Sequence, residues 1–147
     1  MVKSYKGVEH IEEKKLEPKK LVADYMATKL ISFSPELSIY EAMQSLLKHK
    51  ISGAPVVGRD NELLGVLSEG DCLKEIVKGK YENEINHSGT VGDHMTTSVT
   101  TIVAGMGILE AAHFFLEKRF RRFPVVKNGK LIGLLTQTDV MRAMNDF

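Results

Sequence analysis

The sequence predicts an α/β (α+β) fold built from two similar units, because one pattern of residues occurs twice along the chain. Asp24 returns as Asp93, and the Ser-x-x-Asp segment 68–71 returns as Thr-x-x-Asp at 136–139 after almost the same separation. In both copies, short apolar runs alternate with stretches whose apolar residues recur at helical spacing. A repeat over most of a chain indicates that each copy is one structural unit, whose apolar face is covered by its neighbour.

Each unit is expected to form a small mixed three-stranded sheet with flanking helices, and the two units are expected to pack as a pseudo-two-fold pair. The chain has 147 residues, and a unit of about 55 residues is marginal when it stands alone. Packing against a similar unit should therefore stabilise both. The expected organisation is a charged N-terminal lead at 1–20, a first unit at 21–78, a linker at 79–90 and a second unit at 91–147.

The first unit carries clear signals for its helices and strands. Ser38 and Glu41 have the spacing of a capping box, in which the hydroxyl accepts a hydrogen bond from the amide three residues on. Pro55 lacks an amide hydrogen, so its strand should begin there or lie at an edge. The elements expected in order are a helical turn at 22–27, a strand at 30–33, a helix with Ile39, Ala42, Met43, Leu46 and Leu47 on its inner face, strands at 54–57 and 63–67, and a helix from Ser68 to about Lys78.

The second unit repeats this plan with two local differences. Asn128 and Gly129 form the strongest short signal for a hairpin turn. Gly107 stands where the first unit has Ser38, so the following helix loses its hydroxyl cap. The expected elements are a strand at 99–102, a helix at 108–118 with Ile108, Ala111, Ala112 and Phe115 inward, strands at 123–126 and 131–135, and a helix from Thr136 to about Met144.

The bulk composition is that of an ordinary globular protein. Hydrophobic residues make up 43% and charged residues 27% of the chain, and the formal net charge is +1. This balance favours neither a membrane nor nucleic acid as a partner, and no apolar run approaches the ~20 residues that span a bilayer. Cys72 is the single cysteine, which excludes an internal disulfide and suits a reducing, cytoplasmic environment.

Catalytic and metal-binding patterns are missing from the sequence. Five histidines are scattered without the paired spacing of metal ligands, at His10, His49, His87, His94 and His113. Cys72 lies beside Asp71, whose charge disfavours a thiolate although a helix start favours one, and we expect it to be a small buried residue. No glycine-rich phosphate loop and no set of nucleophile, base and orienting residue is present. The sequence therefore predicts no enzyme, no catalytic residue, no metal and no resident cofactor.

Four paired motifs carry a resemblance to a known family. They are Asp24-Tyr-Met26 with Asp93-His-Met95, Ala54-Pro-Val-Val57 with Phe123-Pro-Val-Val126, the strands around Gly65 and Gly133, and Ser68-x-x-Asp71 with Thr136-x-x-Asp139. In this order and double occurrence they resemble the CBS domain. The tandem, from about Leu21 to Met144, resembles a CBS pair, or Bateman module.

The resemblance implies a free-standing regulatory protein without a catalytic domain. Such a protein senses an adenosine-containing ligand, such as AMP, ADP, ATP or S-adenosylmethionine, in clefts between its two units. The resemblance also implies a homodimer formed through the helices. A target protein, which the sequence does not name, would respond to the change that the ligand causes.

Ser68, Asp71, Thr136 and Asp139 are the first candidate ligand residues. A hydroxyl followed three residues later by a carboxylate is capping chemistry in its own right. The same helix start offers free amides and positive potential to a phosphate, and an ionised Asp can accept hydrogen bonds from both hydroxyls of a ribose. The resemblance implies this second use, with the Asp on the ribose and the Ser or Thr near a phosphate.

Two further sets of residues are assigned through the resemblance. Family members that bind phosphates often carry basic residues where this chain has Arg121 and Arg122, and Arg can clamp a phosphate through two parallel hydrogen bonds. The alternative is a solvated basic edge, and the first unit has Ser52 and Gly53 at these positions. The adenine slots, each beside a proline, are assigned to Thr28, Ile31, Ala54 and Pro55 in the first unit and to Thr96, Thr100, Phe123 and Pro124 in the second.

Two other interpretations stay open. A protein of this fold that binds no nucleotide would act as a structural or protein-interaction module. Three features favour this interpretation: the Gly105-Met-Gly107 loop, the bulk of Phe123 and the absence of a basic pair in the first unit. The bulk of Phe123 would narrow one adenine slot. Nucleic-acid binding through the basic lead and the segment 118–122 is disfavoured by the overall charge.

Overall fold

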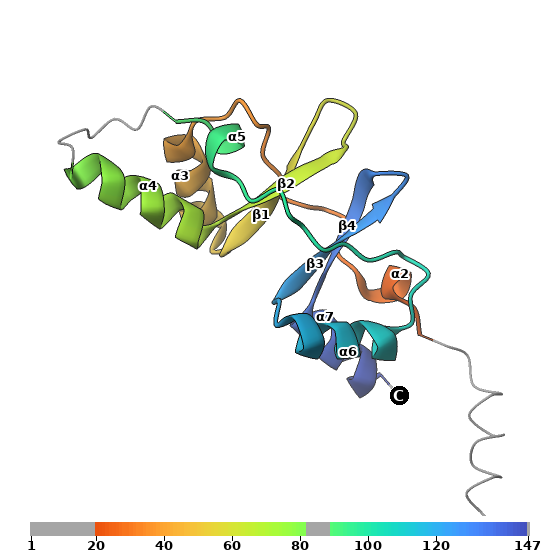
Figure 1. Cartoon of the computed structure of the whole chain (residues 1–147). Coiled ribbons are helices and arrows are strands. Elements are labelled where there is room, and N and C mark those ends of the chain that lie inside the picture. Colours follow the sequence, from red (N-terminus) through yellow and green to blue (C-terminus); the bar gives the residue numbers. More distant parts are fainter. Residues whose placement is uncertain (1–19, 82–88, 147) are drawn as a thin grey trace, which may run out of the picture.

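The computed structural model describes residues 20–81 and 89–146, which form two units side by side (Figure 1). Most of the predicted lead at 1–20 and the middle of the predicted linker at 79–90 lie outside these residues. Each unit has an antiparallel hairpin near the centre of the molecule and helices toward its outer end (Figure 1). The mixed α and β class and the paired units agree with the prediction.

The helices and strands follow the repeat in the sequence. The first unit contains α3 (Ile39–His49), β1 (Gly53–Val57), β2 (Leu63–Ser68) and α4 (Glu69–Tyr81). The second contains α6 (Ile108–Lys118), β3 (Arg122–Lys127), β4 (Lys130–Thr136) and α7 (Gln137–Asn145). Two short helices, α2 (Val22–Tyr25) and α5 (Val91–His94), precede the units in sequence. Because α4 continues to Tyr81, the start of the predicted linker is helical.

The third strand of each sheet is much shorter than the sequence suggested. The predicted strand at 30–33 is reduced to Phe33, which pairs in parallel with β1 through Phe33 N to Pro55 O at 3.0 Å and Val57 N to Phe33 O at 2.9 Å. The predicted strand at 99–102 is likewise reduced to a parallel bridge at Ile102. Each sheet is therefore an antiparallel pair of strands with one parallel bridge beside it, where a mixed sheet of three strands was predicted. The residues that precede each bridge leave the sheet and turn toward the space between the units.

The hairpins meet at their tips. Asn128 and Gly129 both have positive φ, 53° and 78°, as a two-residue type I′ hairpin turn requires. Leu63 N donates to Gly129 O at 3.0 Å, and Leu131 N donates to Asn61 O at 2.9 Å. The turn predicted at 128–129 is therefore present, and it also joins the two units.

Each short helix packs on the unit to which it does not belong in sequence. Val22 of α2 is fully buried in the second core, with Ile108 and Phe115, whereas Val91 of α5 is fully buried in the first core, with Ile39. Figure 1 shows α2 beside α6 and α7, and α5 beside α3. The units of the sequence repeat thus exchange their leading segments, which the repeat pattern did not predict.

Two glycines allow the exchanged segments to cross the hairpins. Thr96 pairs with Val66 of β2 through two hydrogen bonds of 2.9 Å. A Cβ atom at the neighbouring Gly65 would lie only 2.6 Å from Thr96 O, and one at Gly133 only 2.5 Å from the sulfur of Met26. The glycines of the repeated motifs therefore make room for the segments that carry the Asp-x-Met motifs.

The helix ends mostly match the predictions. Ser38 Oγ accepts from Glu41 N at 3.1 Å, although the Glu41 carboxylate accepts from the Ser38 hydroxyl and not from its amide. Gly107 provides no side-chain cap, as expected. Leu47 was predicted to lie on the inner face of α3 but is 73% exposed. It lies one residue beyond the buried Leu46, and a helix of 3.6 residues per turn carries it past the covered stripe.

Candidate functional site

Two clefts lie between the units, and each takes residues from both. Cleft A, of about 390 Å³, lies between Thr96 and Thr100 of the segment that leads into the second unit and Ser68 at the start of α4 in the first. Cleft B, of about 1090 Å³, lies between Ile31 of the first unit and Thr136 at the start of α7 in the second. The slot residues of one unit therefore face the Ser/Thr-x-x-Asp helix start of the other.

The predicted site residues divide into three groups. Those that line cleft A are Pro55, Ser68, Thr96, Thr100, Arg121, Arg122 and Pro124. Those that line cleft B are Ile31, Pro55, Arg121, Arg122 and Thr136. The structure places five outside both linings, namely Thr28, Ala54, Asp71, Phe123 and Asp139.

Ala54 and Phe123 lie in the two cores beneath the clefts. Ala54 is 1% exposed and Phe123 is fully buried. The Phe123 ring packs against Phe115, with the ring centroids 4.6 Å apart, and also against Phe114 and Phe120. Both residues therefore support the floor between the strands and do not project into the open clefts.

Ser68 and Asp71 form a capping box at the start of α4. Asp71 N donates to Ser68 Oγ at 3.3 Å, and Asp71 Oδ2 accepts from Ser68 N at 2.9 Å and from Ser68 Oγ at 3.0 Å. Asp71 is partly exposed. Among the described residues, none donates a hydrogen bond to the second oxygen, Oδ1. This carboxylate thus combines capping with a spare acceptor.

Thr136 and Asp139 form the matching capping box at the start of α7, with a different environment. Asp139 Oδ2 accepts from Thr136 N at 2.9 Å, and Asp139 N donates to Thr136 Oγ1 at 3.2 Å. The other oxygen, Oδ1, accepts from Arg142 Nη2 at 2.9 Å. Asp139 is 7% exposed, so both oxygens are engaged in a buried position.

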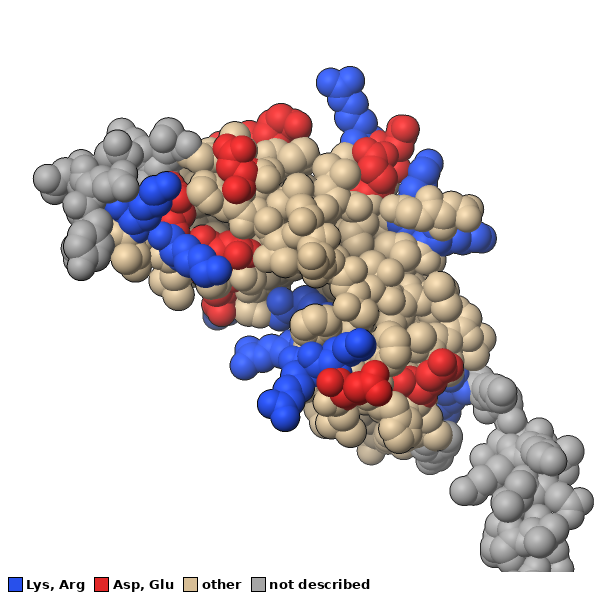
Figure 2. All heavy atoms as spheres, in the orientation of Figure 1, with Lys and Arg blue, Asp and Glu red and all other residues tan. Residues whose placement is uncertain are grey.

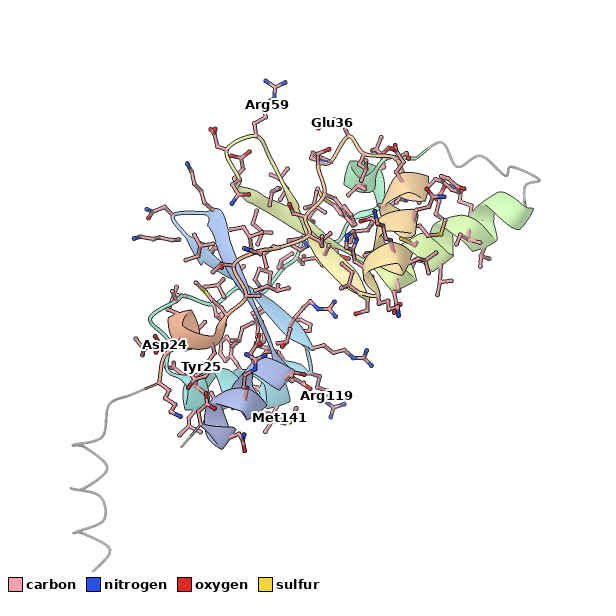
Figure 3. The ribbon with its side chains drawn as sticks, turned by 180° about the vertical axis from the view of Figure 1, so that it is seen from behind. Asp24, Tyr25, Glu36, Arg59, Arg119 and Met141 are labelled. Atoms are coloured by element: carbon pink, nitrogen blue, oxygen red, sulfur yellow. The ribbon has the colours of Figure 1, made fainter. Side chains whose placement is uncertain are left out.

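Three arginines line cleft A, two from the loop between α6 and β3 and one from the start of β3. Arg121 and Arg122 were predicted from the sequence, and Arg119 joins them in the lining. Figure 2 shows Lys and Arg side chains gathered at the hollow between the two units, and Figure 3 labels Arg119 at the end of α6. Arg119 ends α6 in the left-handed conformation, with φ of 59°. No pattern in the sequence predicted this left-handed residue, and Arg119 was not among the predicted ligand residues.

Arg122 reaches across from the second unit to the first. Its Nη2 donates a short hydrogen bond to Ser52 Oγ, and a Cβ atom at Gly53 would lie 3.0 Å from its Nη1. Burial lowers the pKa of Arg122, the neighbouring Arg121 lowers it further, and Glu69 raises it. The first unit carries no basic side chain at 52–53, and the small residues there admit the guanidinium of the second.

Cys72 and His94 are two further titratable groups among the described residues. Cys72 is buried, as predicted, and the pKa of its thiol is raised by burial and by the charges of Asp71 and Glu69. His94 pairs with Glu75 at 3.3 Å. Within residues 20–81 and 89–146, no group of three or more His, Cys, Asp or Glu residues is placed to hold a metal ion. No helix in the same ranges is long and apolar enough to cross a membrane.

Two small α+β units that exchange their leading segments and enclose paired clefts define a tandem module with ligand-sized sites between its halves. The family model for the CBS domain matches the chain twice, at residues 22–78 and 91–146. The chain therefore belongs to the CBS domain family, as its motifs predicted.

Solved structures and curated relatives agree with this assignment. A structure of CBSX2 in complex with AMP is 34% identical, with a TM-score of 0.75, and the match covers 86% of this chain and 97% of that one. The CBS domain pair of protein MJ0100 in complex with 5′-methylthioadenosine and S-adenosyl-L-methionine is 25% identical, with a TM-score of 0.70, over 88% and 98% of the two chains.

Among curated relatives, the chloroplastic CBS domain-containing protein CBSX2 of Arabidopsis thaliana is 32% identical, and the match covers 83% of this chain. The chain spans 42% to 63% of the length of three of the curated relatives that it matches.

Proposed function

We propose that the chain is a regulatory module that binds an adenosine-containing nucleotide in cleft A and signals to a partner protein. One observation carries the proposal: cleft A combines the start of α4 at Ser68 with three arginines, and Asp71 of α4, the next residue after the lining residues Ser68, Glu69 and Gly70, has a spare acceptor oxygen. These are the groups that a phosphate and a ribose require. The complexes of CBSX2 with AMP and of the MJ0100 domain pair with S-adenosyl-L-methionine support an adenosyl ligand.

Each part of the ligand has a proposed partner in cleft A or directly beside it. The ribose hydroxyls donate to Asp71 Oδ1, on α4 directly after the lining residues Ser68, Glu69 and Gly70. The phosphates meet Arg119, Arg121 and Arg122. The adenine lies near the slot residues of the crossing segment, Thr96, Val99 and Thr100, and near Pro124. A volume of about 390 Å³ lies within the usual range of small-molecule sites, roughly 300–1,000 Å³.

Cleft B is the proposed second position of the same kind. Ile31 and Pro55 line its slot and Thr136 its helix start, with Thr28, Ala54 and Asp139 nearby in sequence. Cleft B also extends over apolar side chains of α3 and α4, including Met43, Leu46 and Leu73. Cleft B, at about 1090 Å³, is larger than the usual small-molecule site of roughly 300–1,000 Å³. Cleft A, at about 390 Å³, falls within that range, and we take it as the better nucleotide site.

Signalling follows from the position of the ligand between the units. A ligand that touches both units favours the arrangement to which it binds best, and a partner can respond to that shift. The proposed activity is therefore binding and regulation, not catalysis. The free, buried Cys72 suits a reducing compartment such as the cytoplasm.

A homodimer formed through the helices is part of the proposal. Large apolar side chains lie exposed on the helices of the second unit, with Leu109 61%, Leu116 77% and Met141 63% exposed. Leu47 and Leu73 of the first unit are 73% and 59% exposed and also line cleft B. Met141 is labelled on α7 in Figure 3. Exposed apolar surface of this kind favours association, and light scattering of the purified chain measures it directly.

A module that binds proteins and no nucleotide is the second candidate, because the same apolar helix faces and the apolar wall of cleft B suit a protein partner. A thermal-shift screen against AMP, ADP, ATP, S-adenosylmethionine, NAD and adenosine separates the two. A ligand that binds only the folded chain stabilises it by about 2.7 kcal/mol at a hundredfold excess over Kd. A rise in Tm with an adenosine compound is expected. Absence of any rise, with protein shown to be free of nucleotide, would favour the second candidate.

A further inference from the structure

The two Ser/Thr-x-x-Asp motifs are alike in sequence but differ in the state of their carboxylates. Asp71 uses one oxygen in its capping box, and none of the described residues donates a hydrogen bond to the other. Asp139 uses Oδ2 in its capping box and binds Arg142 through Oδ1, at 2.9 Å. A ribose that approached Asp139 would have to displace this guanidinium.

The difference arises from one position in the repeat. The residue three places after Asp71 is Lys74, and the residue three places after Asp139 is Arg142. Residues three apart on a helix are neighbours. Lys74 is exposed and, in the part of the chain that the structure describes, makes no hydrogen bond or ion pair. Arginine presents a weakly hydrated planar fork to a carboxylate, whereas the lysine ammonium is strongly hydrated.

Burial makes the Arg142 contact harder to displace than an ordinary surface ion pair. The side chain of Asp139 is 9% exposed and that of Arg142 is 54% exposed. The carboxylate therefore has little access to water, and release of the guanidinium would leave it with an unpaired oxygen. Exposed pairs gain little because water replaces the partner readily, but a buried carboxylate that loses its partner is penalised strongly.

We propose that Arg142 is a positioning residue that makes the two clefts unequal. Its guanidinium occupies the Asp139 oxygen that a ribose in cleft B would need. Asp71, on the helix whose start lines cleft A, keeps its free oxygen and is the working ribose acceptor. The chain then binds one nucleotide, in cleft A, although its repeat supplies the motif twice. This inference rests on the proposed function of cleft A as a nucleotide site.

Isothermal titration calorimetry with AMP, and separately with ATP, tests the inference because it measures how many nucleotides each chain binds. We expect the unmodified chain to bind one equivalent, which Asp71→Asn abolishes and Asp139→Asn leaves unchanged. Arg142→Ala is expected to add a second equivalent. The double variant with Arg142→Ala and Asp139→Asn is expected to return to one equivalent, because the second site needs the released carboxylate. Arg142→Ala leaves the buried Asp139 carboxylate without its partner and is expected to lower Tm, so a thermal melt of each variant verifies that it is folded at the temperature of the titration.

The exchange of Lys74 and Arg142 provides the reciprocal test. Arg142→Lys places in the second unit the residue that the first unit has, and it should add the second equivalent as Arg142→Ala does. Lys74→Arg places a guanidinium beside Asp71. It is expected to weaken nucleotide binding in cleft A at least several-fold with no fall in Tm.

The outcomes separate the inference from the proposed function. One Asp71-dependent equivalent in the unmodified chain, with no second equivalent in Arg142→Ala or Arg142→Lys, overturns the inference and leaves the proposed function in place. If the unmodified chain binds two equivalents of nucleotide and Asp139→Asn loses one of them, the inference about Arg142 is also overturned and the proposed function still stands. No binding of AMP or ATP by the unmodified chain or by any variant overturns both.

Discussion

Arg122 of β3 donates a hydrogen bond to the hydroxyl of Ser52 and so joins the second unit to the first at the place where clefts A and B meet. The arginine lines both clefts, and its side chain is partly buried. An anion in either cleft would compete with Ser52 for the same donors. Ligand binding and the contact between the units are therefore coupled through one side chain, which gives occupancy a physical route to the relative position of the units.

The first prediction concerns phosphate recognition by Arg122. Arg122→Ala is expected to weaken the binding of AMP or ATP about tenfold to a hundredfold, since a hydrogen bond to a charged group contributes about 1.5–3 kcal/mol. The affinity for adenosine, which has no phosphate, should change much less. Titration calorimetry with the three compounds gives the comparison.

Arg59→Ala is the matched control for this charge removal. Arg59 is exposed on the turn between β1 and β2, and Figure 3 shows its side chain pointing away from the rest of the molecule. Arg59→Ala should leave the affinities for AMP, ATP and adenosine unchanged. Equal losses for adenosine and for the phosphorylated ligands in Arg122→Ala would contradict phosphate clamping and indicate a general change in the cleft.

The second prediction concerns the reactivity of Cys72. Burial and the charges of Asp71 and Glu69 raise the pKa of its thiol, so at pH 8 the folded chain should hold less thiolate than the unfolded chain. Because the thiolate is the nucleophile, reaction with a disulfide reagent should be much slower in the folded protein and should accelerate as the pH rises. The same chain in guanidinium serves as the control, and equal rates in both states would show that the thiol is accessible.

The residue types of the candidate site were predictable from the sequence, but their grouping was not. The motif at 68–71 and the arginines at 121–122 are local patterns that any reader of the sequence can find. The exchange of the leading segments decides which adenine slot faces which helix start. This exchange depends on packing between residues far apart in the sequence. The ion pair of Arg142 with Asp139 is a further case, because sequence spacing allows it in both units and only the side-chain geometry shows it in one.

The fold also has parts that the sequence predicted and parts that it did not. Periodicity and capping signals predicted α3, α6 and the turn at 128–129, because these depend on neighbours in sequence. The strands predicted at 30–33 and 99–102 are single bridges at Phe33 and Ile102, because the apolar residues before them serve the clefts and not the sheet. An apolar run does not reveal which surface it covers.

The third prediction tests the crossing of Gly65 by the segment of the other unit. Gly65→Ala places a Cβ atom 2.6 Å from the backbone oxygen of Thr96, and the strand pair must shift to relieve this contact. We expect a loss of stability of about 1–3 kcal/mol, measured by denaturant unfolding. Gly105→Ala is the matched control, because its Cβ atom would meet nothing within 4 Å. It should be neutral or slightly stabilising, since alanine restricts the unfolded chain.

The fourth prediction tests the exchange of the leading segments through Val22. Val22 belongs to the first unit in the repeat, but it is fully buried against the second core, beside Ile108 and Phe115. Val22→Ala should therefore destabilise the protein by about 1–3 kcal/mol. The resulting NMR chemical-shift changes should be largest in α6 and α7 and small in α3. Val91→Ala should show the opposite distribution, with the largest changes in α3.

Expression of the units as separate chains extends this prediction. A chain that ends at 81 keeps Val22 without the core that buries it and lacks Val91 from its own core, so it should give the poorly dispersed amide spectrum of an unfolded chain. A chain that begins at 89 lacks Val22 and should behave in the same way. Mixing the two restores both exchanged contacts, and a dispersed spectrum is expected on mixing. Val77→Ala, at an exposed position of α4, is the control that should disturb neither core. Two fragments that fold independently, with shift changes for Val22→Ala confined to residues 39–68, would show that the leading segments remain with their own units in solution.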